Sequence, residues 1–130
     1  MGRARRLKTN SKRRDSPTRS KLSACLVELI KPYRSDRESQ KEYERLVLLG
    51  TFAWNLPLLR AVEQSKLIAQ VVDSFPAADR RMASVLIHVL VRRRNDLFSS
   101  DRRMIVSFEV IARPGAFAVT VASFDANDEQ

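Results

Sequence analysis

The chain has 130 residues, 44% of them hydrophobic, and a formal net charge of +9, which predicts one domain with one core and argues against a second domain. Met1 to Lys21 contains nine lysines and arginines against the single Asp15, a net charge of +8, so the other 109 residues carry only +1. The folded part is therefore nearly neutral, and only the N-terminal segment favours an anionic partner.

Cys25 is the only cysteine and cannot close an intramolecular disulfide. The basic start runs into polar residues and not into an apolar segment, so we expect no secretion signal and a reducing, cytoplasmic location. The N-terminal segment has the arginine and serine content of an organellar transit peptide. Leu7 is its one large aliphatic residue, however, so it lacks the amphipathic face of such a peptide.

The pattern of apolar residues predicts an α+β domain that is mainly helical, with a four-helix core followed by a C-terminal two-stranded antiparallel hairpin. Residues 1–15 contain almost nothing to bury and are predicted to be a basic disordered tail. Residues 16–124 are predicted to form a single globular domain, and residues 125–130 an acidic, frayed C-terminus.

The first two helices are defined by capping residues and prolines. The first is predicted to begin after Ser16 as its N-cap and to end before Pro32. Its apolar residues recur at helical spacing: Leu22, Cys25, Leu26, Leu29, Ile30 and Tyr33. This spacing places Cys25 on the buried face. Ser35 and Glu38 have the spacing of a capping box, so the second helix is predicted to begin there.

The second helix continues into the central segment Leu46–Leu59, fourteen residues without a charge that include the only tryptophan, Trp54. A helix needs about 20 apolar residues to cross a bilayer, and Thr51, Asn55 and Pro57 interrupt this shorter run. It is therefore predicted to be a core helix covered by the other helices, not a membrane span. Pro57 lacks an amide donor, so the helix should break or kink close to it.

The third helix is predicted from Leu58 to Asp73 and the fourth from Pro76 to Asp96. The apolar face of the third comprises Leu67, Ile68, Val71, Val72 and Phe75. That of the fourth comprises Met82, Val85, Leu86, Val89 and Leu90, widened by Ile87 and Val91. This assignment leaves a narrow polar line on the fourth helix: Arg81, Ser84, His88, Arg92 and Asn95.

After Arg102 the apolar period changes from helical to two, which predicts strands. Met104, Val106, Phe108 and Val110 alternate with Ile105, Ser107, Glu109 and Ile111. Pro114 and Gly115 mark a turn, which would place Val110 opposite Val119 and Phe108 opposite Val121. A two-stranded hairpin is marginal in water, so it must pack on the helices, pair with another chain, or do both.

The candidate nucleic-acid-binding residues are cations: Arg3, Arg5, Arg6, Lys8, Lys12, Arg13 and Arg14 in the tail, and Arg92, Arg93 and Arg94 on the fourth helix. The tail residues suit phosphates without sequence specificity, and no aromatic residue is interleaved for base stacking. The alternative for the tail is a solubilising or localisation arm. For the three helix arginines we favour a stabilising role, in which they complement the helix dipole and pair with nearby aspartates.

The order of third helix, turn, fourth helix and hairpin resembles a winged helix, in which one helix enters a DNA groove. That helix would present Arg80, Arg81, Ser84, His88 and Arg92. A recognition helix needs a broad polar face, however, whereas the polar line here is about one residue wide. The resemblance is one of architecture, since no diagnostic motif accompanies it.

No motif indicates catalysis, a cofactor or a metal site. The single histidine and single cysteine do not make a four-ligand site, and the three glycines are too far apart for a phosphate loop. We therefore expect a non-enzymatic accessory module whose tail binds RNA or DNA without sequence specificity. The alternative is a protein-interaction or homodimerisation module that uses the edge of the C-terminal hairpin.

Overall fold

The computed structural model describes residues 21–125, which form four α-helices and a two-stranded antiparallel hairpin. The helices are α2 (Leu22–Ile30), α3 (Gln40–Asn55), α4 (Ala61–Asp73) and α5 (Arg80–Phe98), and the strands are β1 (Arg103–Arg113) and β2 (Ala116–Asp125). The predicted α+β fold, mainly helical, is confirmed. The predictions for the disordered tail, for Ser16 and for the acidic C-terminus beyond Asp125 fall outside the described residues.

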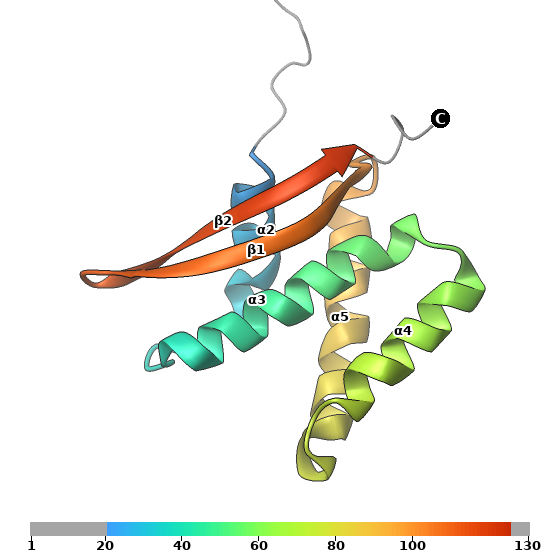
Figure 1. The fold of residues 1–130 in the computed structure, drawn as a ribbon, viewed down its shortest axis with the longest axis horizontal. Coiled ribbons are helices and arrows are strands. Elements are labelled where there is room, and N and C mark those ends of the chain that lie inside the picture. Colours follow the sequence, from blue (N-terminus) through green and yellow to red (C-terminus); the bar gives the residue numbers. More distant parts are fainter. Residues whose placement is uncertain (1–20, 126–130) are drawn as a thin grey trace, which may run out of the picture.

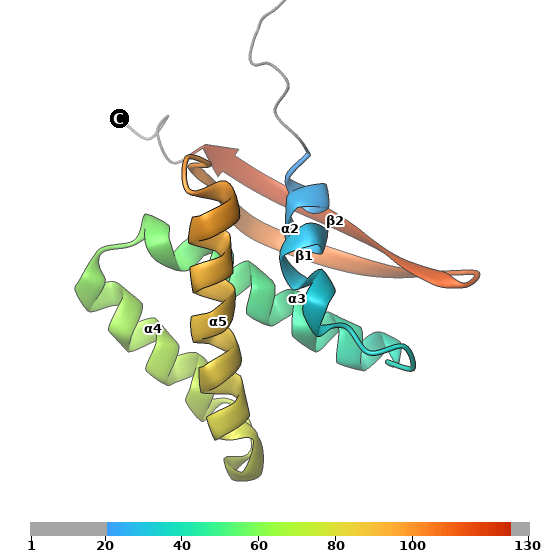
Figure 2. The same cartoon turned by 180° about the vertical axis from the view of Figure 1, so that it is seen from behind.

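The hairpin lies across α2 and α3, while α4 and α5 extend away from it (Figure 1). From behind, α2 and α5 lie side by side, with the beginning of α2 next to the end of α5 (Figure 2). The central helix is α3, because α2, α5 and β1 all pack against it. The predicted packing of the hairpin on the helices is therefore confirmed.

The central apolar segment lies in the core, as predicted. Trp54 has no exposed surface, and the side chains around it on α3 are also buried: Leu46, Val47, Leu49 and Ala53. Leu48 is the exception at 48% exposure, so the other helices cover α3 only in part. Gly50 lies where α2 crosses α3, and a Cβ there would lie 2.5 Å from Cγ2 of Ile30, so only glycine allows this close approach.

Both proline predictions near the helix ends are confirmed. The helix α3 ends at Asn55, and a 3-10 helical turn follows at Leu56–Leu58 with Pro57 inside it. The helix α2 ends at Ile30, and a similar turn follows at Lys31–Tyr33. Cys25 is buried as predicted, whereas Tyr33 lies beyond the helix and is 38% exposed.

The capping box of α3 lies later in the chain than predicted. The hydroxyl of Ser39 accepts a hydrogen bond from the amide of Glu42 at 3.1 Å, and the Glu42 carboxylate accepts one from the amide of Ser39 at 2.8 Å. These bonds lower the pKa of Glu42. Ser35 and Glu38 have the same spacing but form a turn before the helix. The later pair caps the helix because no apolar residue lies between it and the earlier pair, so a longer helix would bury nothing.

The buried face of α5 also differs from the prediction. Met82, Val85 and Val89 are 72%, 56% and 37% exposed, whereas the buried residues are Ala83, Ile87, Leu90 and Arg94. These four also follow helical spacing. Apolar residues cover more than one face of this helix, so periodicity alone did not identify the face that meets α3. The helix α4 begins at Ala61, later than predicted, and its apolar side is half-buried.

The hairpin has the predicted register, with Val110 opposite Val119 and Phe108 opposite Val121. A bulge at Val106, between Ile105 and Ser107, interrupts the alternation along β1. Because of this extra residue, Ile105 and Val110 are both buried, although they are an odd number of positions apart, and Val106 is 64% exposed. The predicted inward row that included Val106 is therefore wrong for the first part of β1.

The Trp54→Ala substitution should lower the free energy of unfolding by about 3 to 5 kcal/mol, because it empties a fully buried site. Urea unfolding followed by circular dichroism measures the change, since the variant has no tryptophan fluorescence. Leu48→Ala on the same helix is the control and should cost far less, because Leu48 is 48% exposed. Equal losses would show that Trp54 is not at the centre of the core.

The Ser39→Ala substitution should lower the free energy of unfolding by about 0.5 to 2 kcal/mol, the usual effect of removing an N-cap. Ser35→Ala is the matched control, because Ser35 precedes the helix and its hydroxyl accepts a single bond, from the amide of Arg37. Thermal unfolding of both variants tests the assignment, and a larger loss for Ser35→Ala would place the helix start at the earlier pair.

Candidate interaction surfaces

Side chains from α3 bind the backbone of the outer edge of β1. The indole Nε1 of Trp54 donates to the carbonyl of Arg103 at 2.7 Å. The amide of Asn55 makes two bonds to Ile105, donating to its carbonyl and accepting from its N–H, both at 2.9 Å. At the other end of α3, Gln40 donates to the carbonyl of Val110 at 3.3 Å. The helix therefore takes the place that a neighbouring strand would have.

These bonds show which way each strand's backbone groups point. The Val110 carbonyl points toward α3, so Val110 and its opposite residue Val119 are a non-hydrogen-bonded pair of the antiparallel ladder. The N–H and C=O of Val119 must then point away from β1. The same holds for residues two positions apart along β2, namely Phe117, Val121 and Ser123. No described residue hydrogen-bonds to these outward groups.

The two edges of the hairpin are therefore different. On the β1 edge, α3 hydrogen-bonds to Arg103, Ile105 and Val110. On the β2 edge, no residue from 21 to 125 hydrogen-bonds to the outward backbone groups of Phe117, Val119, Val121 and Ser123. The β2 edge also borders a shallow pocket of about 380 Å³, whose lining includes Val119 of β2 and Ser23, Ala24 and Val27 of α2. An open edge of this kind can accept an added strand.

Of the three arginines proposed on the fourth helix, Arg94 lies inside the fold. It is 1% exposed, its guanidinium lies 4.2 Å from the centre of the Trp54 ring, and its nitrogens donate to the carbonyls of Trp54, Phe98 and Asp101. Burial lowers its pKa. It therefore satisfies carbonyls at the end of α5 and is not accessible to an external phosphate.

Arg93 and Arg92 are placed differently from Arg94. Arg93 donates to the carbonyls of Leu29 and Glu28 at 3.0 Å, and so binds the end of α2. Arg92 is exposed. Arg94 and Arg93 therefore make contacts that join elements of the fold. Arg92 is the accessible cation of the three. Arg3, Arg5, Arg6, Lys8, Lys12, Arg13 and Arg14 lie outside the described residues.

An ion pair closes the connection between α5 and β1. Asp101 accepts two hydrogen bonds from the guanidinium of Arg103, at 3.0 and 2.6 Å, and both side chains are largely buried. The hydrogen bonds that Arg103 donates to Asp101 raise the pKa of Arg103. This pair holds the start of β1 at the position where its carbonyl meets Trp54.

The arrangement does not fit a winged helix. In Figure 1, α4 and α5 run as antiparallel neighbours, and the tip of the hairpin lies on the opposite side of the molecule from them. A wing would have to flank the recognition helix. Met82 and Val85 are also exposed on α5, so its outer face is not the polar face that a DNA groove requires.

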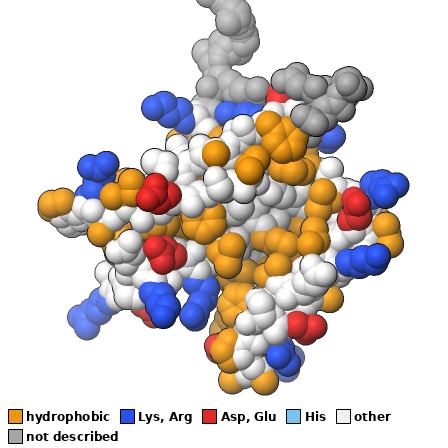
Figure 3. All heavy atoms as spheres, in the orientation of Figure 1, with side chains coloured by type: hydrophobic (Ala, Val, Ile, Leu, Met, Phe, Trp, Pro, Cys, Tyr) orange, Lys and Arg blue, Asp and Glu red, His pale blue; other side chains and the backbone are white. Residues whose placement is uncertain are grey.

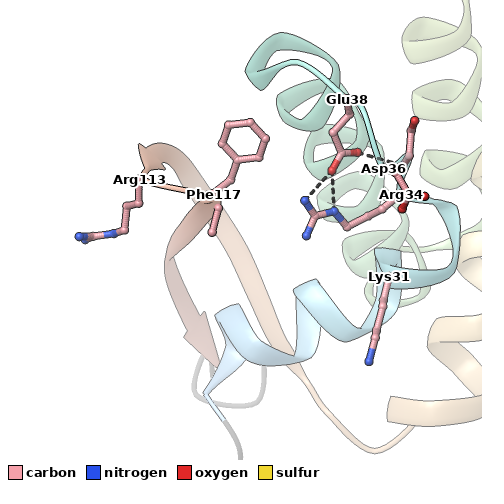
Figure 4. Close-up of a pocket in the computed structure, with 9 residues that line it drawn as sticks. Lys31, Arg34, Asp36, Glu38, Arg113 and Phe117 are labelled. Carbon is pink, nitrogen blue, oxygen red and sulfur yellow. Dashed lines mark hydrogen bonds and ion pairs between the residues drawn. The ribbon is translucent and has the colours of Figure 1, made fainter.

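A cavity of about 640 Å³ lies between the hairpin tip and the loop that joins α2 to α3 (Figure 4). Its cations do not converge. Arg34 is paired with Glu38, with its Nε 2.6 Å from the carboxylate, while Lys31 and Arg113 point away from it. Arg34 also lies over the ring of Tyr43, which stacks on Phe117 at 5.2 Å. This cluster anchors the hairpin tip and is not an anion site.

Hydrophobic side chains also gather between β1, α3 and α4 (Figure 3). A hollow of about 260 Å³ beside the start of α5 is lined by Leu46, Leu49, Phe75, Met82, Ala83 and Leu86, with charged residues at its rim. The helix α4 has no fully buried residue. This side of the domain is therefore less densely packed than the side under the hairpin.

The single histidine and the single cysteine lie on different helices. His88 is exposed, and its Nδ1 lies 2.8 Å from the carbonyl of Ser84 in the same helix. Cys25 is buried. Between residues 21 and 125, no cluster of three or more histidine, cysteine or acidic side chains is arranged to hold a metal ion. No helix within the same range combines the length and hydropathy needed to cross a membrane.

Comparisons with protein-family models, with curated proteins and with solved structures found no match.

Two features of these surfaces were not predicted from the sequence. Asn55 was interpreted only as an interruption of the apolar segment, although a lone amide in such a segment is a signal that it satisfies a buried backbone group. The stretch Ala116–Phe124 contains no charge, proline or glycine. Natural edge strands usually carry such protective residues, so their absence marks β2 as an unusual edge.

The Asn55→Ala substitution should lower the free energy of unfolding by about 1 to 3 kcal/mol for each of the two Ile105 backbone groups that lose a partner. Asn55→Asp keeps the acceptor for the Ile105 N–H but places a carboxylate oxygen against the Ile105 carbonyl, so its loss should be at least as large. Urea unfolding measures both. Asn95→Ala, at an exposed position of α5, is the control, and an equal effect of Asn95→Ala and Asn55→Ala would show that α3 does not hold β1 in this way.

Proposed function

We propose that this chain is a non-enzymatic cytoplasmic module that uses its N-terminal segment to bind RNA or DNA without sequence specificity. The observation that carries the proposal is the separation of charge, since Met1 to Lys21 holds a net +8 of the total +9. Cations that neutralise backbone phosphates release counterions, and this release supplies most of the free energy of nonspecific binding.

The position of Lys21 supports the proposal. Lys21 is exposed and precedes α2, whose beginning lies beside the end of α5 (Figure 2). Arg102, in the loop after α5, is also exposed. The basic segment is thus joined to the domain beside the end of α5. Arg93 and Arg94 are engaged within the fold, so the seven tail cations carry the phosphate contacts in this proposal, with Arg92 as an accessory.

Binding to duplex DNA should weaken steeply with salt. If five tail cations contact phosphates, the slope of log affinity against log salt concentration should be about −4.5. The measurement is fluorescence anisotropy with labelled mixed-sequence DNA and RNA at several salt concentrations, using the full chain. Random-sequence and fixed-sequence probes should bind alike.

The matched variant replaces Arg3, Arg5, Arg6, Lys8, Lys12, Arg13 and Arg14 by glutamine and keeps the full length. This variant should lose most of its affinity and nearly all of the salt dependence. Arg92→Gln is the control on the folded domain and should change the slope by about one at most. If the glutamine variant binds as tightly as the original chain, the tail has no role in binding and the proposal fails.

A further inference from the structure

The β2 edge has the backbone groups that an added strand needs. The N–H and C=O groups of Phe117, Val119, Val121 and Ser123 point away from β1, and no residue between 21 and 125 hydrogen-bonds to them. Along the opposite edge, side chains of α3 bind the carbonyls of Arg103, Ile105 and Val110 and the N–H of Ile105. A strand can therefore be added on the β2 side of this hairpin.

The sequence of β2 suits pairing with a copy of itself. The nine residues Ala116–Phe124 carry no charge, so an antiparallel copy brings no like charges together. The outer-face side chains at the centre of the strand, Ala118, Thr120 and Ala122, are small, and Phe124 lies on the same face near its end. The inward side chains Val119 and Val121 are β-branched and half-buried, which favours cross-strand packing.

We propose that the β2 edge pairs with the β2 edge of a second copy of this chain, forming an antiparallel four-stranded sheet across a two-fold axis. This inference concerns a different surface from the tail and does not depend on whether the tail binds nucleic acid. A two-fold axis normal to the sheet keeps the helices of both copies on the same face.

The pattern of hydrogen bonds restricts the register. Residues whose N–H and C=O groups point away from β1 must lie opposite residues of the same kind in the second copy. The two-fold axis therefore has to pass through a residue and not between two residues. An axis at Thr120 pairs all nine uncharged residues, placing Thr120 opposite Thr120, Val119 opposite Val121, and Ala118 opposite Ala122. Thr120 then belongs to a non-hydrogen-bonded pair, because its own N–H and C=O point toward β1.

In this register Asp125 of the second copy would lie opposite Gly115, just beyond the uncharged stretch, so the paired strands bring no like charges together at either end. The shallow pocket beside the β2 edge is lined by the small or apolar Ser23, Ala24, Val27 and Val119 and by the charged Glu28, Lys31 and Arg34.

Cysteine crosslinking in the full chain tests the register. The Cα atoms of a non-hydrogen-bonded pair are about 4.5 Å apart, which suits a disulfide. Thr120→Cys should therefore form a disulfide-linked dimer under mild oxidation. Ala118→Cys alone should not, because its position lies about 13 Å from its own copy at about 3.3 Å per residue. A mixture of Ala118→Cys and Ala122→Cys chains should crosslink to each other.

Sedimentation equilibrium of the nuclease-treated full chain, at high salt, tests self-association itself. The original chain should be a dimer, and Thr120→Lys or Thr120→Glu should shift it to monomer, while an equimolar mixture of the two variants should recover the dimer. Val106→Lys, at the 64% exposed bulge of β1, is the matched control and should remain dimeric. A monomeric original chain, or a dimer unaffected by Thr120→Lys, would overturn the inference.

Discussion

The fold depends on the hydrogen bonds that side chains of α3 make to the edge of β1 that faces away from β2. A two-stranded hairpin has two unpaired edges and little stability of its own in water. Here Trp54 and Asn55 at one end of the helix and Gln40 at the other bind β1 backbone groups. The same helix buries its apolar side chains under the hairpin, so packing and backbone satisfaction act together.

The bulge at Val106 makes this arrangement possible. Ile105 and Val110 both direct their backbone toward α3 and their side chains into the core, which a regular strand forbids for residues separated by five positions. Because the extra residue lies in β1, the strand β2 keeps its regular alternation. The β1 edge thus binds α3 within the chain, and the β2 edge is suited to a second copy. A dimer would carry two cationic segments, which would raise affinity for a long polyanion through multivalency.

The arginines show how poorly a residue's charge predicts its role. Arg94 is buried against Trp54 and binds three carbonyls, and Arg93 binds the end of α2, so both act as scaffolding between elements that are far apart in sequence. In the sequence they are indistinguishable from Arg92, which is exposed. Arginines near a helix end can therefore donate hydrogen bonds to carbonyl groups that have no partner within a helix. For this reason the phosphate-binding proposal is assigned to the tail.

The sequence by itself determined the class of fold, the buried position of Trp54, the helix end before Pro57 and the register of Val110 opposite Val119, because periodicity, proline geometry and turn residues act locally. It also determined the separation of charge. Only the tertiary structure decided that Ser39 caps α3, that Arg94 is buried on α5, and that Asn55 binds Ile105. Those outcomes depend on which of several equally apolar or equally polar faces meets a neighbour, and that choice is set by packing between segments distant in the chain.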